Sequence, residues 1–528
     1  MDDTSLPPQV GTPPPPPDAP PMGPPPEQSY TIDSSAPQSF AVNQEQPFVV
    51  SPAASSNVNP FIPQITPEYQ NTDTTTTGTV GPGGNSMGKR IMIILIVLLV
   101  AVAGFFGIRS ILGRNNPATG GITGSKSASL VYWGLWENDA TVRAVLSEFE
   151  ATHPTIKVQY IKQNPKQYRE RLQAFIAKGE GPDVFRFHNT WVPMLRNELS
   201  PAPSTVMSAQ EFSTSFYPVA NADLVGGQYV YGVPMEIDGL GLFYNEDLFA
   251  AAGVAPPTTW EDVLNIVPKL TVRSDNTIIT SAIALGTTGN VEHFSDILAT
   301  MMMQNGAKLS IPTGQQAEEA LTFYKKFSTT SDPVYTWNDS MDNSIYAFSS
   351  GKVAMILAPS WRVFDIKQTS PSLRFKVVPM PQLPGNTVTW ASYWVEGVSA
   401  KSKNAAAAWE LVKFMTSRET TIKMYTEASK TRLFGEPYAR VDMASLISED
   451  PYVGAFVKQA PTAKSFPLAS RTFDNGINTN LIKYLEDAIN GVSQGSSPTE
   501  VLGTAANGFA QVLGNFGLST GSAPKTTP

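Results

Sequence analysis

Short apolar runs alternate along this chain with apolar stripes at helical spacing. Residues 130–133, 156–160 and 183–187 form continuous or alternating apolar segments, which predict three strands. Two stripes with three- and four-residue spacing lie between them and predict amphipathic helices: Val142, Val145, Leu146 and Phe149, then Tyr168, Leu172, Phe175 and Ile176. Strands that alternate with helices of this length predict parallel α/β layers.

Polar residues mark where several helices should begin. Asp139 is expected to cap the first helix, and Asn164 followed by Pro165 is expected to start the second. Thr258 with Glu261 fits a capping box. Ser497, followed at once by proline, predicts the cap of a terminal helix.

The longest apolar run extends from Ile91 to Ile108 and carries no charge. As a helix its 18 residues would span about 27 Å, close to the hydrocarbon thickness of a membrane. The run predicts a transmembrane anchor over residues 89–112. A cleaved signal peptide is the alternative, but a tail of 88 residues precedes the run and no small-x-small cleavage site follows it.

The segments around this run are poor in apolar clusters. Residues 1–88 hold 19 of the 45 prolines and eight acidic residues, with no Lys or Arg. This composition predicts a disordered tail with polyproline II character around residues 13–17. The Gly- and Ser-rich residues 113–129 predict a flexible linker, and residues 518–528 a second disordered tail.

Composition narrows the possible functions. Removing the tail's eight acids leaves 37 acidic residues against 37 Lys and Arg, so the rest of the chain has no positive excess. Nucleic acid is therefore not an expected partner. The chain has no cysteine, which excludes disulfides and thiolate metal sites. Its three histidines lack metal-ligand spacing, and neither a metal nor an organic cofactor is expected.

Five segments together resemble the extracellular solute-binding proteins of family 1, the maltose-binding-protein-like receptors of sugar ABC importers. Residues 231–262 carry the clearest likeness, with an apolar strand, Tyr244-Asn245, a helix ending at Gly253 and a Pro-Pro-Thr-Thr-Trp turn. The other four are residues 131–154, 181–184, 347–361 and 397–415. The family usually carries a signal peptide, often with a lipidated cysteine; here the membrane helix would replace it.

The resemblance implies an α/β fold of two lobes, the type II periplasmic-binding-protein-like fold. Lobe 1 would hold residues 130–236 and 384–430, and lobe 2 residues 237–383 and 431–517. The chain would cross between them near residues 234–239, 378–383 and 431–434. A carbohydrate ligand would lie between the lobes at the strand carboxyl ends, and the closed form would engage the permease subunits of an ABC transporter.

A sugar site needs flat aromatic platforms and planar polar groups. Mapped onto this sequence, the resemblance places the ligand-binding residues in loops after strands and at the crossings: Trp136, Glu137, Asn189, Trp191, Glu236, Asp238, Trp361, Tyr393, Trp394 and Arg432. For Asp238 the alternative is a structural bond across the hinge. For the tryptophans it is core packing. His188 is expected to be a satisfied loop histidine.

Three functions remain open. The first is a receptor that faces outward from the cell membrane, with its N-terminal tail in the cytoplasm, and serves an importer. The second is a sensory ectodomain that signals inward through the same helix. The third is a carbohydrate-active enzyme, for which paired carboxylates such as Glu236 and Asp238 would be required. No complete Walker motif is present. The identity of the ligand and the partner of the tail do not follow from the sequence.

Overall fold

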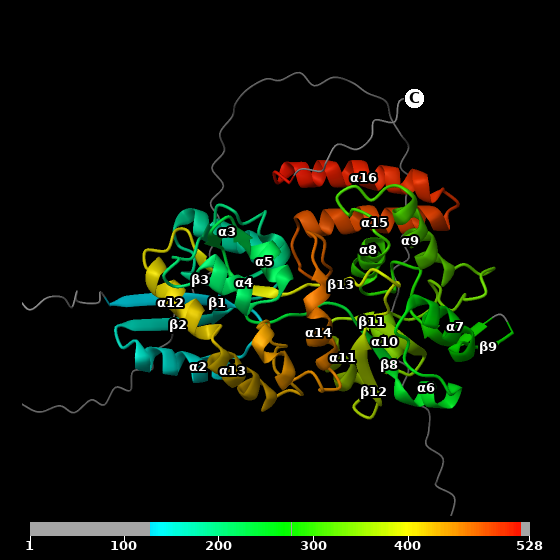
Figure 1. Cartoon of the computed structure of the whole chain (residues 1–528), viewed down its shortest axis with the longest axis horizontal. Helices are drawn as coiled ribbons and strands as arrows, with labels where there is room; N and C mark the ends of the chain where they lie inside the picture. The colour runs from blue at the N-terminus through cyan, green and yellow to red at the C-terminus, as the bar shows by residue number, and fades with distance from the viewer. Residues whose placement is uncertain (1–126, 276, 519–528) are drawn as a thin grey trace, which may run out of the picture. The chain divides into compact units, whose positions relative to one another are not determined.

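The computed structural model describes residues 127–275 and 277–518 (Figure 1). The predicted acidic tail, the anchor from Ile91 to Ile108 and nearly all of the linker lie outside these ranges. Across the two described ranges, no helix has both the length and the apolar character needed to span a membrane.

The first lobe is built on a mixed sheet with the strand order β2-β1-β3-β14-β4. Its strands are β1 (Ala128–Gly134), β2 (Ile156–Lys162), β3 (Val184–His188), β4 (Leu199–Ser200) and β14 (Trp394–Ser399), with β7 (Val233–Pro234) also paired to β14. Strand β1 runs parallel to β2 and β3, whereas β14 runs antiparallel to β3. Helices α2 (Asp139–Thr152) and α12 (Ala405–Met415) pack on this sheet.

The second lobe has its own mixed sheet, in the order β12-β8-β11-β10-β9. The strands are β8 (Gly241–Asn245), β9 (Val272–Ser274), β10 (Thr277–Ile283), β11 (Val353–Ala358) and β12 (Phe375–Pro379). Every residue of the central strand β11 is buried. Helices α6 (Glu246–Ala252), α7 (Trp260–Leu270) and α14 (Gly454–Gln459) pack on the strands.

The remaining elements surround these two sheets (Figure 1). The further described helices are α3 (Tyr168–Lys178), α4 (Ala209–Ser215), α5 (Pro218–Leu224), α8 (Phe294–Gln304), α9 (Gln315–Lys326), α10 (Ser344–Ser349), α11 (Arg362–Thr369), α13 (Arg418–Ser429), α15 (Ile477–Ser493) and α16 (Pro498–Asn515). Three short 3₁₀ turns are η1 (Asn189–Trp191), η2 (Val441–Leu446) and η3 (Ala460–Thr462), and the short strands are β5 (Val225–Gly226), β6 (Tyr229–Val230), β13 (Thr389–Trp390) and β15 (Ala463–Lys464). Helices α15 and α16 lie against each other and cover α9 of the second lobe.

Three of the expected helix caps are displaced. Asn138, not Asp139, caps α2, because its side chain accepts the backbone N–H of Thr141. Helix α3 begins only at Tyr168, and Asn164 instead accepts from the N–H of Lys166 in a local turn. The capping box of α7 uses Thr259 rather than its neighbour.

The capping box of α7 starts one residue later than predicted because the sequence offers two equivalent threonines. Thr258 and Thr259 each precede an acidic residue by three positions, and the structure pairs Thr259 with Asp262. The predicted cap of α16 is confirmed: Ser497 accepts from the N–H of Glu500, with proline at the next position.

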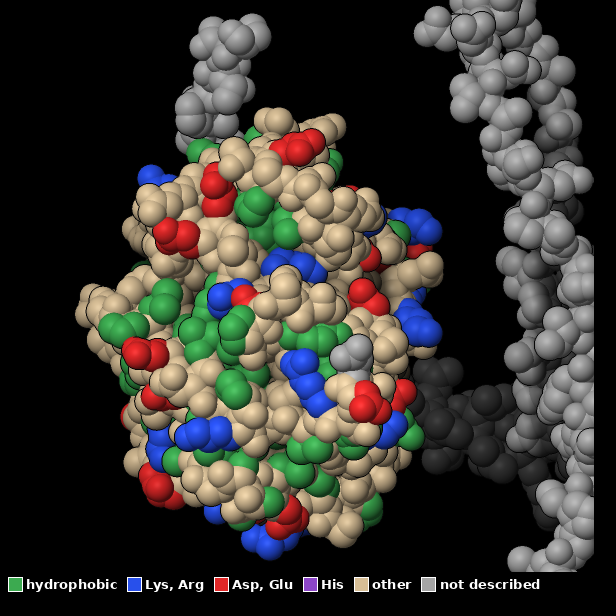
Figure 2. Space-filling view, turned by 90° about the vertical axis from the view of Figure 1, so that its right-hand side faces the viewer, with side chains coloured by type: hydrophobic (Ala, Val, Ile, Leu, Met, Phe, Trp, Pro, Cys, Tyr) green, Lys and Arg blue, Asp and Glu red, His purple; other side chains and the backbone are tan. Residues whose placement is uncertain are grey.

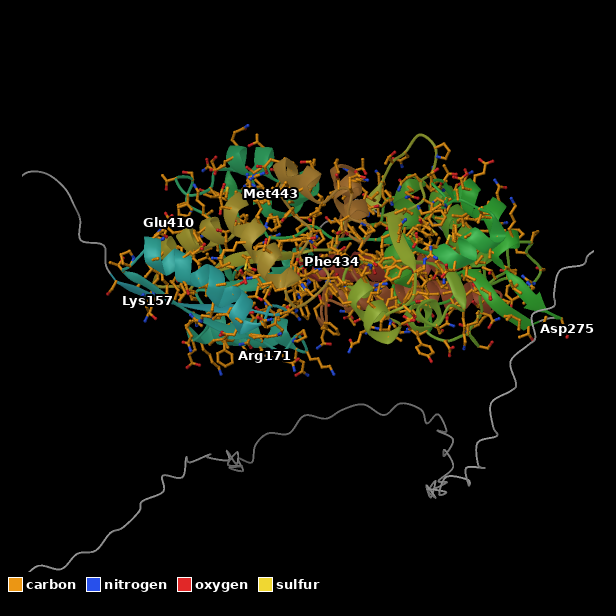
Figure 3. All side chains as sticks on the ribbon, turned by 90° about the horizontal axis from the view of Figure 1, so that it is seen from below. Lys157, Arg171, Asp275, Glu410, Phe434 and Met443 are labelled. Atoms are coloured by element: carbon orange, nitrogen blue, oxygen red, sulfur yellow. The ribbon has the colours of Figure 1, made fainter. Side chains whose placement is uncertain are left out.

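The three segments that cross between the sheets lie side by side. The N–H of Ile237 donates to the carbonyl of Pro437 at 2.9 Å, and the N–H of Ser392 donates to the carbonyl of Asp238 at 2.9 Å. Gly239 is required here because a Cβ at this position would lie 1.9 Å from the carbonyl oxygen of Trp390. Figure 3 shows Phe434, on the third crossing, between the two lobes.

Two of the crossing segments do not pass directly from one sheet to the other. After β12 the chain stays against the second lobe, where Asn386 donates to the carbonyl of Gln304 on α8, and it joins the first sheet again only at Trp394. After α13 the turn η2 packs against α4 of the first lobe before the chain reaches α14. Both lobes therefore share their boundary through several segments rather than one linker.

Candidate functional site

An aromatic cluster lies where β1 and β3 end and β14 begins. The ring of Trp394 stands edge-on to Trp136 at 5.5 Å and to Trp191 at 5.3 Å between centroids. Trp191 is 1 % exposed, whereas Trp136 is 36 % exposed and Trp394 is half-buried. Trp191 thus packs against Trp394 inside the protein, whereas Trp136 and Trp394 keep part of their ring surface exposed.

His188 completes this cluster from inside. Its ring centroid lies 5.0 Å from that of Trp394, and its ring nitrogens contact the hydroxyls of Thr190 and Ser392. Burial lowers the pKa of His188 to about 3, so the imidazole is neutral at physiological pH. His188 thus has hydrogen-bond partners, as the sequence predicts, but it is the last residue of β3 rather than a loop residue.

On the second lobe, Trp361 follows β11 and is 37 % exposed. The guanidinium of Arg362 stacks over its ring at 4.0 Å. Arg362 in turn forms ion pairs with Glu292 at 2.6 Å and Asp365 at 2.7 Å. The ring of His293 also stands edge-on to Trp361, at 6.0 Å between centroids. Trp361 therefore has two fixed neighbours and keeps exposed surface.

A buried charge network underlies Trp136. Arg186, at 2 % exposure, binds Glu137 at 2.5 Å and Glu396 at 2.7 Å. The hydroxyl of Tyr132 donates to Glu396 at 3.0 Å. One guanidinium thus forms ion pairs with two carboxylates that burial would otherwise destabilise, and it fixes the orientation of Glu137.

The two acidic residues of the first crossing have different partners. Asp238 accepts from the N–H and Oγ–H of Ser360 and from the N–H of Gly239, which ties the crossing to the loop after β11. Burial outweighs these donors and raises the pKa of Asp238 to about 7. Glu236 accepts from the N–H of Trp394 at 3.2 Å.

Glu236 also lies beside Glu436. Burial, and then the adjacent carboxylate, raise the pKa of Glu236 well above its ordinary value. Although burial alone would raise it, the pKa of Glu436 is lowered by its ion pair with Arg432, at 2.6 Å. Of the two carboxyl groups, Glu236 is therefore the one whose protonated form is favoured.

Asn189 and Tyr393 both donate hydrogen bonds to another carboxylate, that of Asp223 on α5. The side-chain amide of Asn189 donates to it at 2.9 Å, and the hydroxyl of Tyr393 at 2.7 Å. Both donors are buried. Ser465, near β15, also donates to Asp223, so this polar cluster joins the two lobes.

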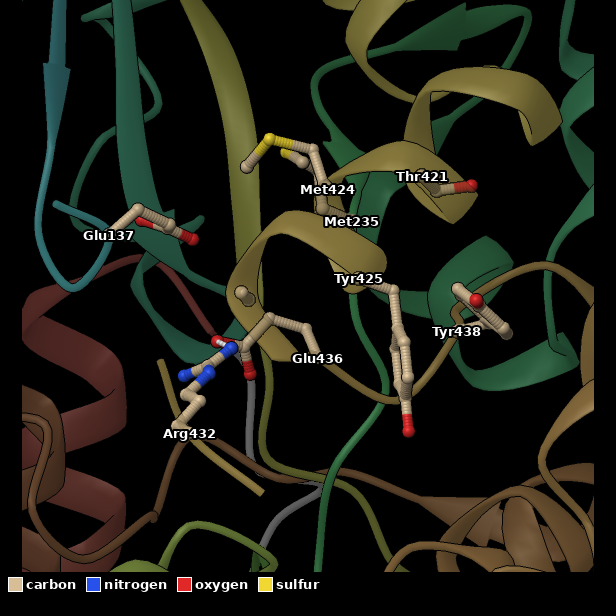
Figure 4. A pocket seen from close by; sticks show the side chains of 9 residues that line it. Glu137, Met235, Thr421, Met424, Tyr425, Arg432, Glu436 and Tyr438 are labelled. Atoms are coloured by element: carbon tan, nitrogen blue, oxygen red, sulfur yellow. Dashed lines mark hydrogen bonds and ion pairs between the residues drawn. The ribbon is translucent and has the colours of Figure 1, made fainter. Parts of the chain in front are cut away.

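A small pocket brings Glu137 and Arg432 together (Figure 4). It is lined by Glu137, Met235, Thr421, Met424, Tyr425, Ala428, Arg432, Glu436 and Tyr438. Sequence reasoning missed the four residues from α13 because their spacing is that of an ordinary buried helix stripe. It also missed Arg186, Asp223 and Glu436, which no local motif marks.

Nine of the ten predicted residues thus fall into three groups. Trp136, Trp191 and Trp394 form the aromatic cluster, with Glu137 beneath it; Glu236, Asp238 and Arg432 lie at the crossings; Asn189 and Tyr393 bind Asp223. Trp361 stands apart on the second lobe. Among the described residues, no group of three or more His, Asp and Glu side chains is arranged to hold a metal ion.

The profile of the bacterial extracellular solute-binding proteins matches residues 144–432, more than half of the chain. The chain belongs to this family. Its two-lobed α/β fold, expected from the resemblance, is confirmed by solved structures of the same kind. The unliganded and acarbose-bound GacH receptor of Streptomyces glaucescens superposes with a TM-score of 0.57 at 22 % identity, over 74 % of this chain and all of that one.

Other proteins that resemble this chain are sugar-binding proteins by name. The sugar-binding protein MalE of Xanthomonas citri gives a TM-score of 0.60 at 20 % identity, over 74 % of this chain and 100 % of that chain. The multiple sugar-binding protein of Streptococcus mutans is 24 % identical over 55 % of this chain and 71 % of its own length. The maltotriose-binding protein of Pyrococcus abyssi is 21 % identical over 56 % of this solute-binding protein and 64 % of its own length.

Proposed function

We propose that this solute-binding protein captures a carbohydrate, an oligosaccharide, between its two lobes and delivers it to the permease of an ABC importer. The observation that carries the proposal is the pair of half-exposed indoles, Trp136 on one lobe and Trp361 on the other. Large aromatic side chains are mostly buried in soluble proteins. Two that remain open, each in a loop that follows a strand, supply platforms for the C–H faces of sugar rings.

Two polar groups of the pocket in Figure 4 support the same proposal. Glu137 is oriented by Arg186, and Arg432 by Glu436, so neither must be ordered when a ligand binds. The names of relatives, a multiple sugar-binding protein and a maltotriose-binding protein, add to it. On the face seen in Figure 2, which is the second-lobe end of the molecule in Figure 1, described Lys and Arg side chains are interspersed with Asp and Glu, so this face offers no basic patch to a polyanion.

The proposal assigns binding, not chemistry. A glycosidase needs two carboxyl groups free to act on either side of the scissile bond. Here Glu137 and Glu396 share Arg186, and Asp238 is held by Ser360. Incubating the protein with the glycans that it binds is expected to return them unchanged; release of shorter sugars would contradict this part of the proposal.

A thermal-shift screen of the full chain against a saccharide library tests the binding proposal. A ligand that binds only the native state raises the melting temperature by mass action. We expect at least one oligosaccharide to do so, and Trp136→Ala and Trp361→Ala each to weaken it by about tenfold or more. Tyr229→Ala, which removes an exposed ring on β6, is the matched control. Shifts given only by peptides or polyamines would refute the carbohydrate assignment.

The anchoring part of the proposal concerns residues outside the described ranges. We propose that the run from Ile91 to Ile108 tethers the two lobes outside the cell and leaves the proline-rich tail in the cytoplasm. Cells that express the full chain should hold it in the membrane fraction, with the lobes open to added protease. Deletion of residues 89–112 should leave the protein inside the cell in the soluble fraction; membrane retention of that variant would contradict the tether.

A further inference from the structure

The pocket under helix α13 has one polar end and apolar walls. Figure 4 shows Glu137, Arg432 and Glu436 on one side of it, with the rings of Tyr425 and Tyr438 on the other. Met235 and Ala428 complete the apolar lining. The first crossing, the third crossing and α13 all contribute, so the pocket lies where the first lobe meets the hinge.

Its polar end holds two atoms whose hydrogen-bonding capacity is unused by the described protein atoms. Glu137 is 8 % exposed, and its Oε1 binds Arg186 while its Oε2 has no partner. Arg432 binds Glu436 through Nη2, while its buried Nε–H has no partner. Buried polar groups in native proteins are almost always paired, so these two atoms point to a bound group.

The two atoms differ in kind, and this selects the bound group. Glu137 offers an acceptor and Arg432 a donor, and a hydroxyl satisfies both at once. An ammonium would pair with Glu137 but leave the Nε–H of Arg432 unmet. A carboxylate or phosphate would be repelled by Glu137 and Glu436. The sulfur and methyl groups of Met235 and Met424 suit a CH₂ next to that hydroxyl.

We propose that this pocket takes the exocyclic hydroxymethyl group of a hexose ring. The hydroxyl donates to Oε2 of Glu137 and accepts from Nε of Arg432, and the methylene packs between Met235 and Met424. This assignment rests on the proposed carbohydrate function and narrows it to oligosaccharides of hexopyranoses. Pentopyranose oligomers, which lack the group, leave both polar atoms unpaired and bind weakly.

The first test compares sugars on the full chain in detergent by titration calorimetry. The probes are maltotriose, cellotriose and mannotriose against xylotriose, a pentopyranose trisaccharide. We expect the best hexose trisaccharide to bind about tenfold or more tightly than xylotriose. A smaller ratio overturns the hydroxymethyl assignment while the carbohydrate function stands. Binding of none of the four, together with no shift in the saccharide screen, would remove both proposals, which separates the two failures.

The second test fills the pocket. Ala428→Leu adds three carbons to a buried lining position of α13 without lowering helix propensity much. We expect the affinity for the best hexose trisaccharide to fall by more than about threefold, with an unchanged circular dichroism spectrum. Ala250→Leu on the exposed face of α6 is the matched control and should bind normally. If the pocket holds only water, Ala428→Leu binds within threefold of the parent, and the assignment falls.

Discussion

The carboxyl of Asp238 gives a direct test of how the hinge responds to pH. Its pKa is 3.8 in a model peptide and about 7 in the folded protein, because burial outweighs the three donors around it. The folded state therefore holds a proton that the unfolded state has released between these two pH values. Stability from this group is fully present below about pH 4 and is lost as the pH rises to about 7.

The size of the effect follows from the shift. A difference of about three pKa units corresponds to a free-energy change on the order of 4 kcal/mol across this range. Asp238→Asn removes the titration and keeps the local geometry. The amide oxygen can accept from the N–H groups of Gly239 and Ser360, and the amide nitrogen can donate to the Oγ of Ser360.

Urea unfolding of the parent and the variant at intervals from about pH 4 to pH 8 measures the difference. The parent should lose stability relative to Asp238→Asn as the pH rises, with most of the change complete near pH 7. Asp262→Asn is the control. The pKa of Asp262 is lowered to about 2 by its hydrogen bonds at the start of α7, so this group does not titrate within that window. If the free energies of unfolding of the parent and of Asp238→Asn changed with pH in parallel, the reasoning would be refuted.

Two further predictions concern stability. Arg186→Met leaves the buried carboxylates of Glu137 and Glu396 without their ion-pair partner, which should lower the free energy of unfolding by about 3–5 kcal/mol. A loss below about 1 kcal/mol, measured by urea unfolding, would show that the network is solvated. Gly239→Ala places a Cβ against the carbonyl oxygen of Trp390 and should lower the free energy of unfolding by about 1–3 kcal/mol. The loss is measured as a lower melting temperature. An unchanged melting temperature would show that the crossing segments move apart easily.

Much of the fold follows from local sequence patterns. The apolar runs of β1, β2 and β3 and the stripes of α2 and α3 are visible without tertiary information, because burial on one face imposes a period on the chain itself. The first residue of a helix is harder to predict from the sequence than the helix itself. Thr258 and Thr259 offer equivalent caps, and only the packed direction of the chain selects between them.

The candidate site is less accessible from sequence. Trp136 and Trp191 both follow strands of the first sheet, yet one is open and the other is enclosed by neighbouring rings. Asp223 and Glu436 are polar residues in unremarkable surroundings, and they join the site only because distant segments fold against them. Exposure and nonlocal pairing are properties of the packed chain, so no local pattern encodes them.

The position of β14 has a consequence for biosynthesis. This strand joins β3 and completes the middle of the first sheet, although more than 200 residues separate Val184 from Trp394. The five strands of the second sheet all lie within residues 241–379 and leave the ribosome earlier than β14. During translation the edge of β3 therefore stays without its partner strand until β14 has been synthesised. An unpaired strand edge is prone to aggregation, so we expect a chaperone to bind at this edge.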